Sequence, residues 1–325
     1  MSSHSSVFVE AGARLHFGVL DLRGSLGRRF GGLGAAVPSP SVLLEAAPAS
    51  ELHVEGPDRE RAEEFARRFL GYHGLATGAR LVVHRTIPPH SGLGSGTQLG
   101  LAVARALAEL GGLPADTLEL ARAVSRGRRS AIGTWTFALG GFIVEGGRRA
   151  GSNEIAPLLA RFAVPDRWRC VIAVPQGVPG LSGEAEAAAL DRLPPPPEGQ
   201  VERVAHLVLM QLLPALVEAD LPSFGSALTE VQRITGAWFA PQQGGIFAPG
   251  STATLVERMT EWGAAGVGQS SWGPAVYGLV EGGQAAASLA RRARELVGSD
   301  GAVFEGGFAG TGARVWRTEP ARFPD

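Results

Sequence analysis

The sequence predicts an α+β protein built of two lobes, and three observations support this class. Its 325 residues exceed the roughly 100 to 200 that one ordinary core holds. Strand-like and helix-like segments follow one another without strict alternation, which favours α+β over a doubly wound sheet. Apolar periodicity gives way to Gly, Arg, Ser, Asn and Pro near residues 147–168. We therefore predict a first lobe at residues 1–165 and a second at residues 166–325.

The first lobe is predicted to contain five strands and three helices. Apolar or alternating runs bounded by Gly and Pro predict the strands, at residues 7–20, 41–46, 51–55, 80–84 and 141–145. Apolar residues at helical spacing predict the helices, at residues 58–72, 97–110 and 116–125. The second of these helices stops at the glycine pair 111–112, and Asp116 is the predicted N-cap of the third.

The second lobe is predicted by the same patterns. Its strands cover residues 170–174, 275–280, 302–308 and 313–317, and its helices cover residues 184–193, 201–218, 223–239, 252–263 and 284–297. The four prolines at 194–197 predict a stiff extended linker. Cys170 is the only cysteine; it lies in an apolar run, which predicts a core position, and it excludes an intrachain disulfide.

Composition excludes several classes of function. The net charge of −1 provides no basic field for nucleic acid or an anionic membrane, so we expect neither partner. No lysine occurs among the 30 cationic residues, which excludes Schiff-base chemistry, a lysine base and a P-loop lysine. The first six residues lack the pattern of a secretory leader, and no run of about 18 apolar residues occurs. A cytoplasmic location is expected.

A glycine-rich loop at residues 87–98, IPPHSGLGSGTQ, is the most informative stretch. It joins a predicted strand to a predicted helix, so its backbone N–H groups and the helix N-terminus favour an anion. We predict a phosphate or diphosphate site formed by Gly92, Leu93, Gly94, Ser95, Gly96, Thr97 and Gln98. The spacing matches neither a Walker loop nor a dinucleotide-binding loop, and a plain tight turn is the alternative for the glycines alone.

The spacing P-x-x-x-G-L-G-S at residues 88–95 resembles the second motif of the GHMP superfamily of small-molecule kinases. Residues 13–18, ARLHFG, and 266–274, GVGQSSWGP, resemble the first and third motifs in the same order. The resemblance implies a GHMP-kinase-like fold, with a first lobe like ribosomal protein S5 domain 2, a ferredoxin-like second lobe and the site in the cleft between them.

One departure argues against a kinase. Superfamily kinases commonly carry a Ser-Gly-x-Asp stretch whose aspartate is the catalytic base, and Gly133 occupies that place here. An ATP-dependent small-molecule kinase stays an alternative, because some superfamily kinases lack this base. A metabolite-binding module without catalysis is a second alternative.

Residues 129–135, RSAIGTW, 140–147, GGFIVEGG, and 268–274, GQSSWGP, closely resemble one branch, the β-ribofuranosylaminobenzene 5′-phosphate synthases. The resemblance implies transfer of phosphoribose from phosphoribosyl pyrophosphate to 4-aminobenzoate, with release of CO2 and pyrophosphate, in methanopterin biosynthesis. Whether 4-hydroxybenzoate is preferred stays open. The resemblance further implies Mg2+ as cofactor and a homodimer acting on these small molecules.

Site roles are expected from the motif positions. We expect catalytic roles for Arg14 and His16, which could meet phosphate or carboxylate, and for Asp21, which could meet magnesium or ribose or simply form a turn. The predicted substrate-binding residues are His90, Ser130, Thr134, Gln269, Ser270, Ser271 and Trp272, the last either stacking on the aromatic substrate or belonging to the core. Metal ligands are not assigned. Glu184 and Glu186 could be metal ligands, but a solvated first helical turn is favoured. Arg126, Arg128 and Arg129 could supply positive charge to the cleft, but a solvated basic turn is favoured.

Overall fold

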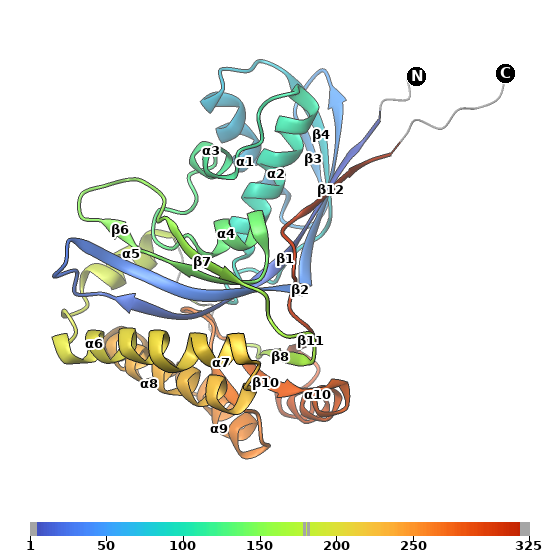
Figure 1. Cartoon of the computed structure of the whole chain (residues 1–325). Helices are drawn as coiled ribbons and strands as arrows, with labels where there is room; N and C mark the ends of the chain where they lie inside the picture. Colours follow the sequence, from blue (N-terminus) through green and yellow to red (C-terminus); the bar gives the residue numbers. More distant parts are fainter. Residues whose placement is uncertain (1–4, 178–179, 181–182, 319–325) are drawn as a thin grey trace.

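Two β-sheets with helices packed against them form the described part of the computed structural model, which comprises residues 5–177, 180 and 183–318 (Figure 1). The larger sheet contains β1 (Val7–Asp21), β2 (Arg28–Ala49), β3 (His53–Glu55), β4 (Gly78–Arg85), β5 (Phe142–Glu145), β6 (Arg148–Arg149), β7 (Leu158–Phe162) and β12 (Arg314–Arg317). The smaller antiparallel sheet has the order β11-β8-β10-β9, formed by β8 (Trp168–Val174), β9 (Gly266–Gln269), β10 (Val276–Glu281) and β11 (Ala302–Gly306). The α+β class is confirmed.

The helices fall into two groups along the chain. Those that follow the first strands are α1 (Arg59–Tyr72), α2 (Ser95–Gly111), α3 (Thr117–Ala123) and α4 (Ile132–Leu139). The later ones are α5 (Gly183–Asp191), α6 (Glu198–Leu207), α7 (Leu213–Glu218), α8 (Leu221–Gln243), α9 (Ser251–Glu261) and α10 (Gly283–Val297). No helix of the described residues is long and apolar enough to cross a membrane.

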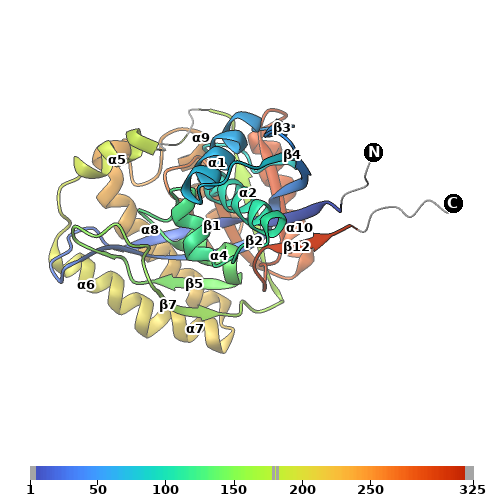
Figure 2. The same ribbon diagram turned by 90° about the horizontal axis from the view of Figure 1, so that it is seen from above.

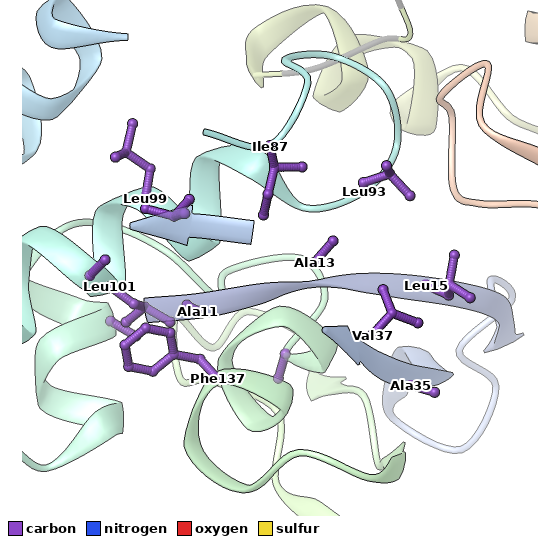
Figure 3. Close-up of a cluster of buried hydrophobic side chains, with 14 of the residues drawn as sticks. Ala11, Ala13, Leu15, Ala35, Val37, Ile87, Leu93, Leu99, Leu101 and Phe137 are labelled. Atoms are coloured by element: carbon purple, nitrogen blue, oxygen red, sulfur yellow. The ribbon is translucent and has the colours of Figure 1, made fainter. Parts of the chain in front are cut away.

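The long antiparallel β1–β2 hairpin is the frame of the first lobe. Side chains alternate across a strand, and in β1 the residues Ala11, Ala13 and Leu15 are fully buried. Figure 3 shows them in one cluster with Leu93 of the glycine-rich loop and Leu99 of α2. The opposite face of β1 is therefore free to carry polar side chains, and Arg14 and His16 lie on it.

Helix α2 lies over the hairpin, as the view from above shows (Figure 2). It is apolar on nearly every side, as expected of a helix enclosed by other elements. Gly100 lets α1 approach closely, because a Cβ there would lie 3.3 Å from the Phe65 ring. The helix begins at Ser95 rather than at the predicted residue 97, since Gly94 adopts a left-handed φ of 82° and acts as the N-cap.

In the second lobe, α8 packs directly on β9. A Cβ on Gly225 of α8 would overlap the Ala265 carbonyl, so the two backbones touch. Helices α9 and α10 share a separate apolar cluster with the smaller sheet. The two lobes also share a core, because Phe17 of β1 contacts Tyr277 of β10 with ring centroids 4.9 Å apart.

Several elements differ from the sequence prediction. The predicted strand at residues 41–46 is only part of β2, which runs through glycines and prolines because β1, β4 and β5 pair with it. The predicted helix over residues 201–218 is interrupted by a π-helical turn, Val208–Leu212, next to Pro214, which lacks the N–H that an α-helix needs. Helix α4 and strands β6, β7 and β9 were not predicted.

The last strand returns to the first lobe. β12 pairs antiparallel with β1, from Val7 opposite Arg317 to Glu10 opposite Arg314. A division at residues 165 and 166 stays a prediction, and the structure adds that β12 belongs to the larger sheet.

Candidate active site

A cavity of about 870 Å³ lies between β1, the glycine-rich loop and the helices of the second lobe. Seven arginines line it, and three of them, Arg14, Arg61 and Arg126, lie beside Gly94 and Gly96 of the loop. Apolar side chains of α8 and the segment after it, including Phe239, Ile246 and Phe247, line it as well. The cavity therefore offers cationic and apolar side chains to a ligand.

The glycine-rich loop presents the start of α2 to this cavity. Thr97 N and Gln98 N both donate to the Gly94 carbonyl at 3.0 Å. The first N–H groups of a helix have no acceptor within the helix, and Ser95 and Gly96, at the first two helical positions, line the cavity. Together with the positive end of the helix dipole, this arrangement fits a phosphate group.

The loop is held in place from three sides. Leu93 is fully buried, and its carbonyl accepts a hydrogen bond from Arg14 N at 3.1 Å. The Gly92 carbonyl accepts from the Arg14 guanidinium and from Ser270 Oγ. A Cβ on Gly92 would overlap the Ser270 carbonyl, so only glycine permits this approach.

Two arginines flank the helix start. A Cβ on Gly96 would lie 3.1 Å from Arg126 Nη2 and 3.3 Å from Arg61 Nη2. Burial, followed by the charges of Arg61, Arg68 and Arg129, lowers the pKa of Arg126 to about 10. These cations repel one another, so an anion between them would relieve the repulsion.

A carboxylate faces the same cations. Glu186 of α5 pairs with Arg129 at 3.1 Å and lines the cavity with it. Burial raises the pKa of Glu186, while Arg129 and Arg14 oppose the rise. The expectation of a solvated helix start is wrong for Glu186, and the side chain of Glu184 lies outside the described residues. The expectation of a solvated basic turn is wrong for Arg126 and Arg129, which are partly buried and line the cavity, whereas Arg128 lines it with an exposed side chain.

His16, on the cavity face of β1, continues into a buried polar chain. Its Nε2 lies 3.2 Å from Ser130 Oγ, and Ser130 also hydrogen-bonds the buried Glu145 carboxyl at the end of β5. Burial and the charge of Arg14 lower the pKa of His16 to about 3, so the imidazole is neutral. Sequence reasoning missed Glu145, although an acidic residue that ends an apolar strand is a usable signal.

Several predicted residues line the cavity. These are Arg14, His16, His90, Gly92, Gly94, Ser95, Gly96, Thr97, Ser130, Gln269, Ser271 and Trp272. Trp272 packs edge-on against Phe239, with ring centroids 4.8 Å apart. The side chain of Gln269 is held by other backbone segments: its Oε1 accepts from Ala248 N, between α8 and α9, at 2.8 Å, and its Nε2 donates to the Ser271 carbonyl at 3.2 Å.

Five other predicted residues, Asp21, Leu93, Gln98, Thr134 and Ser270, lie outside the lining that the described residues form. Asp21 forms the turn that was its alternative, since its Oδ1 accepts from Arg23 N at 2.6 Å and Gly24 N at 2.8 Å. Leu93 belongs to the core beneath the loop, and Thr134 is buried.

The side chains of Gln98 and Ser270 connect backbone segments instead. Gln98 Nε2 donates to the Gly133 carbonyl at 2.9 Å, which ties α2 to α4. Ser270 Oγ accepts from His16 N at 3.0 Å and donates to Gly92, which ties the second lobe to β1 and the loop. These contacts position the site from behind, so the structure does not bring either side chain to the cavity.

Gly133 packs against the loop helix. A Cβ there would lie 3.0 Å from Thr97 Cγ2, which is too close unless Thr97 moves. An aspartate at this position would therefore displace Thr97. For a metal ion, no group of three or more His, Cys, Asp or Glu side chains converges within the described residues.

Two known protein families match this chain, one in each lobe. Residues 60–141 match the family of GHMP kinase N-terminal domains, and residues 212–298 match that of GHMP kinase C-terminal domains. A solved homoserine kinase from Cytophaga hutchinsonii shares the fold, with a TM-score of 0.70 at 18% identity over 97% of this chain and 99% of that one.

Curated relatives are more similar in sequence. The beta-ribofuranosylphenol 5′-phosphate synthase of Methanothermobacter thermautotrophicus is 33% identical over 93% of this chain and 96% of its own length. The protein of the same name from Archaeoglobus fulgidus is 36% identical over 83% of this chain and 86% of its own length. The resemblance seen in the motifs is confirmed, and the chain belongs to the beta-ribofuranosylphenol 5′-phosphate synthase family of the GHMP superfamily.

Proposed function

We propose that this chain transfers the 5-phosphoribosyl group of phosphoribosyl pyrophosphate to 4-hydroxybenzoate or 4-aminobenzoate, releasing CO2 and pyrophosphate, as a step of methanopterin biosynthesis. The relatives are named for a phenol product, and the motifs resemble a family named for the aminobenzene product. The observation that carries the proposal is the pair of cations, Arg61 and Arg126, at the start of α2. The glycine at the place of the kinase base, packed on Thr97, agrees with it.

The bond changes balance without an added acid or base. The ring carbon that bears the carboxylate bonds to ribose C1 as the bond from C1 to the diphosphate breaks, and that electron pair leaves on pyrophosphate. The bond from the ring to the carboxylate then breaks, its electron pair restores the aromatic ring, and CO2 departs. The reaction therefore has no need of the carboxylate base that a kinase uses.

The leaving diphosphate gains charge as the reaction proceeds. Donors that are already oriented towards that charge stabilise the transition state more than the ground state. The amides at Ser95 and Gly96, together with Arg61 and Arg126, are such donors, because the loop is clamped before any ligand binds. We assign the diphosphate to the start of α2 and the aromatic ring to the apolar side chains Phe239 and Trp272, which line the same cavity and pack on each other.

The proposal includes Mg2+, bound together with the diphosphate of the substrate. Mg2+ is commonly held by substrate phosphates with one or two protein carboxylates. Glu64 and Glu186 line the cavity among the arginines, so they are the carboxylates that we assign beside it. The proposal includes a homodimer, which the family resemblance implies, and a cytoplasmic location, which the sequence analysis predicts; light scattering and cell fractionation test them.

The test is turnover with defined products. The purified chain, given Mg2+, phosphoribosyl pyrophosphate and either acceptor, should release CO2 and pyrophosphate in equal amounts. Phosphoribosyl pyrophosphate, but not ATP, should raise the Tm of the protein. A folded sample that shows no turnover with either acceptor, or that phosphorylates a small alcohol with ATP, would refute the proposal.

A further inference from the structure

A row of hydrogen-bonded polar groups lies behind His16, and the role assigned to it here rests on the proposed function. Three residues from β1, the segment before α4 and β5 meet there: His16, Ser130 and Glu145. A Cβ on Gly32 of β2 would lie 3.3 Å from His16 Nε2 and 3.4 Å from Glu145 Oε1, so both groups enclose the same small space. Of these three residues, His16 and Ser130 line the cavity, and Glu145 lies behind them.

The hydrogen-bond donors fix the direction of this chain. Glu145 Oε2 accepts from Gly147 N at 2.7 Å, and Oε1 accepts from Ala131 N at 3.4 Å. When Glu145 is ionised, its carboxylate can only accept, and the Ser130 hydroxyl donates the hydrogen bond that lowers the pKa of Glu145. Ser130 Oγ is then an acceptor, and it accepts from Ile132 N at 3.3 Å.

The hydrogen bond with Ser130 Oγ determines the tautomer of His16. With its proton given to Glu145, Ser130 Oγ accepts from His16 Nε2, which must carry the imidazole proton. A neutral imidazole has only one N–H, so Nδ1 bears a lone pair. No residue of the described part of the chain donates a hydrogen bond to Nδ1.

We propose that Glu145 and Ser130 hold His16 as the Nε2–H tautomer, so that Nδ1 accepts a hydrogen bond from the 4-amino or 4-hydroxyl group of the aromatic acceptor. Glu145 and Ser130 are positioning residues in this account, and His16 is the group that touches the substrate. Held as this tautomer, His16 favours aromatic substrates that carry a hydrogen-bond donor opposite the carboxylate.

This hydrogen bond strengthens as the reaction proceeds. When the ring carbon bonds to ribose C1, the ring loses electron density and the 4-substituent becomes positive and more acidic. An acceptor at Nδ1 therefore binds the transition state more tightly than the ground state. Loss of CO2 returns the electron pair to the ring, so no proton has to be transferred to His16.

Glu145→Gln tests the direction of the chain with almost no change in shape. The amide oxygen can keep the short hydrogen bond from Gly147, which turns the NH2 group towards Ser130 and gives up only the longer hydrogen bond from Ala131 N. Ser130 must then donate to His16 Nε2, and the imidazole proton moves to Nδ1, where it opposes the donor on the substrate. An amide in place of the acid that orients a histidine is expected to act through the tautomer in this way.

Two measurements, made well above pH 7 so that Glu145 is ionised, test the effect of this substitution. Nitrogen-15 spectra of labelled histidine should show the proton of His16 on Nε2 in the wild type and on Nδ1 in Glu145→Gln. The kcat/KM for 4-aminobenzoate should fall about 100-fold and that for 4-hydroxybenzoate about tenfold, because a hydroxyl can also accept a hydrogen bond. The KM for phosphoribosyl pyrophosphate should not change.

Glu45→Gln is the matched control, because Glu45 also contacts a serine and a histidine, Ser6 at 2.8 Å and His84 at 2.9 Å, outside the cavity. It should leave the acceptor ratio unchanged. Ser130→Ala should slow both acceptors to a similar extent. Turnover with an unchanged acceptor ratio in Glu145→Gln, or a wild-type proton on Nδ1, overturns the inference alone; a wild type that turns over neither acceptor overturns the proposed function as well.

Discussion

Arg126→Met is the perturbation that separates the binding of an anion from the stability of the fold. In the free protein Arg126 is surrounded by like charges and partly removed from water, and its pKa falls to about 10. The charge therefore costs stability until an anion binds. The methionine keeps an apolar stem of similar length beside Phe65, whose ring centroid lies 4.8 Å from the guanidinium carbon.

The expected effects on stability and binding differ in size. Removing the charge removes the cost of burying it and its repulsion by the neighbouring arginines. It also loses the cation–π contact with Phe65, which contributes about 0.5–1 kcal/mol. We expect the Tm of the free protein to change by no more than about 2 °C. A hydrogen bond to a charged group contributes about 1.5–3 kcal/mol, so the Kd for pyrophosphate should rise about 10- to 100-fold.

Differential scanning fluorimetry with pyrophosphate and Mg2+ measures both effects without turnover. At a ligand concentration 100 times the wild-type Kd, binding stabilises the wild type by about 2.7 kcal/mol and a variant with 100-fold weaker binding by about 0.4 kcal/mol. Arg122→Met is the matched control, since Arg122 lies in the last turn of α3 with an exposed side chain. Equal stabilisation of Arg126→Met and the wild type by pyrophosphate would refute the reasoning.

Three further predictions follow from the same geometry. Gly94→Val should abolish measurable turnover while the far-UV circular dichroism stays unchanged, because φ at Gly94 is 82° and a Cβ would lie 2.9 Å from Arg14 Cγ; wild-type rates would remove the loop from the mechanism. Gly133→Asp should not create ATP-dependent phosphorylation and should lower the free energy of unfolding by about 1–3 kcal/mol, since it crowds Thr97; denaturant titration and ADP release measure the two effects, and kinase activity would contradict the account. Burial raises the pKa of Glu145 from 4.5 to about 7, so the folded state binds more protons between these values and the wild type should lose stability relative to Glu145→Gln, on the order of 3 kcal/mol, as the pH rises through this range. Unfolding free energies at pH 5 and pH 8 that change in parallel for the two proteins would show that Glu145 does not titrate there.

Local patterns predicted those parts of the fold in which one residue type decides the structure. The alternation in β1 and the apolar surface of α2 were both visible in the sequence, and Asp116 caps α3 as expected, accepting from Glu119 N at 3.0 Å. Strand β2 was predicted only in part, because the glycines and prolines within it are typical of turns. Pairing with β1 on one edge and with β4 and β5 on the other overrides that local preference.

The site, too, was predicted where its residues are contiguous in the sequence and missed where the fold brings them together. The glycine-rich loop is contiguous, so its spacing was enough to predict an anion site at the start of α2. The flanking cations come from α1 and from the segment after α3, and no local pattern shows that Arg61 and Arg126 meet over Gly96. Glu145 was missed for a similar reason, because its partners Ser130 and His16 reach it only after β1, β2 and β5 have paired.

A crystal structure of the chain with phosphoribosyl pyrophosphate and Mg2+ tests the central claim most directly. We predict that the diphosphate oxygens lie within hydrogen-bond distance of the amides of Ser95 and Gly96 and of the guanidinium groups of Arg61 and Arg126. A diphosphate bound elsewhere in the cavity, with the start of α2 unused, would contradict the account.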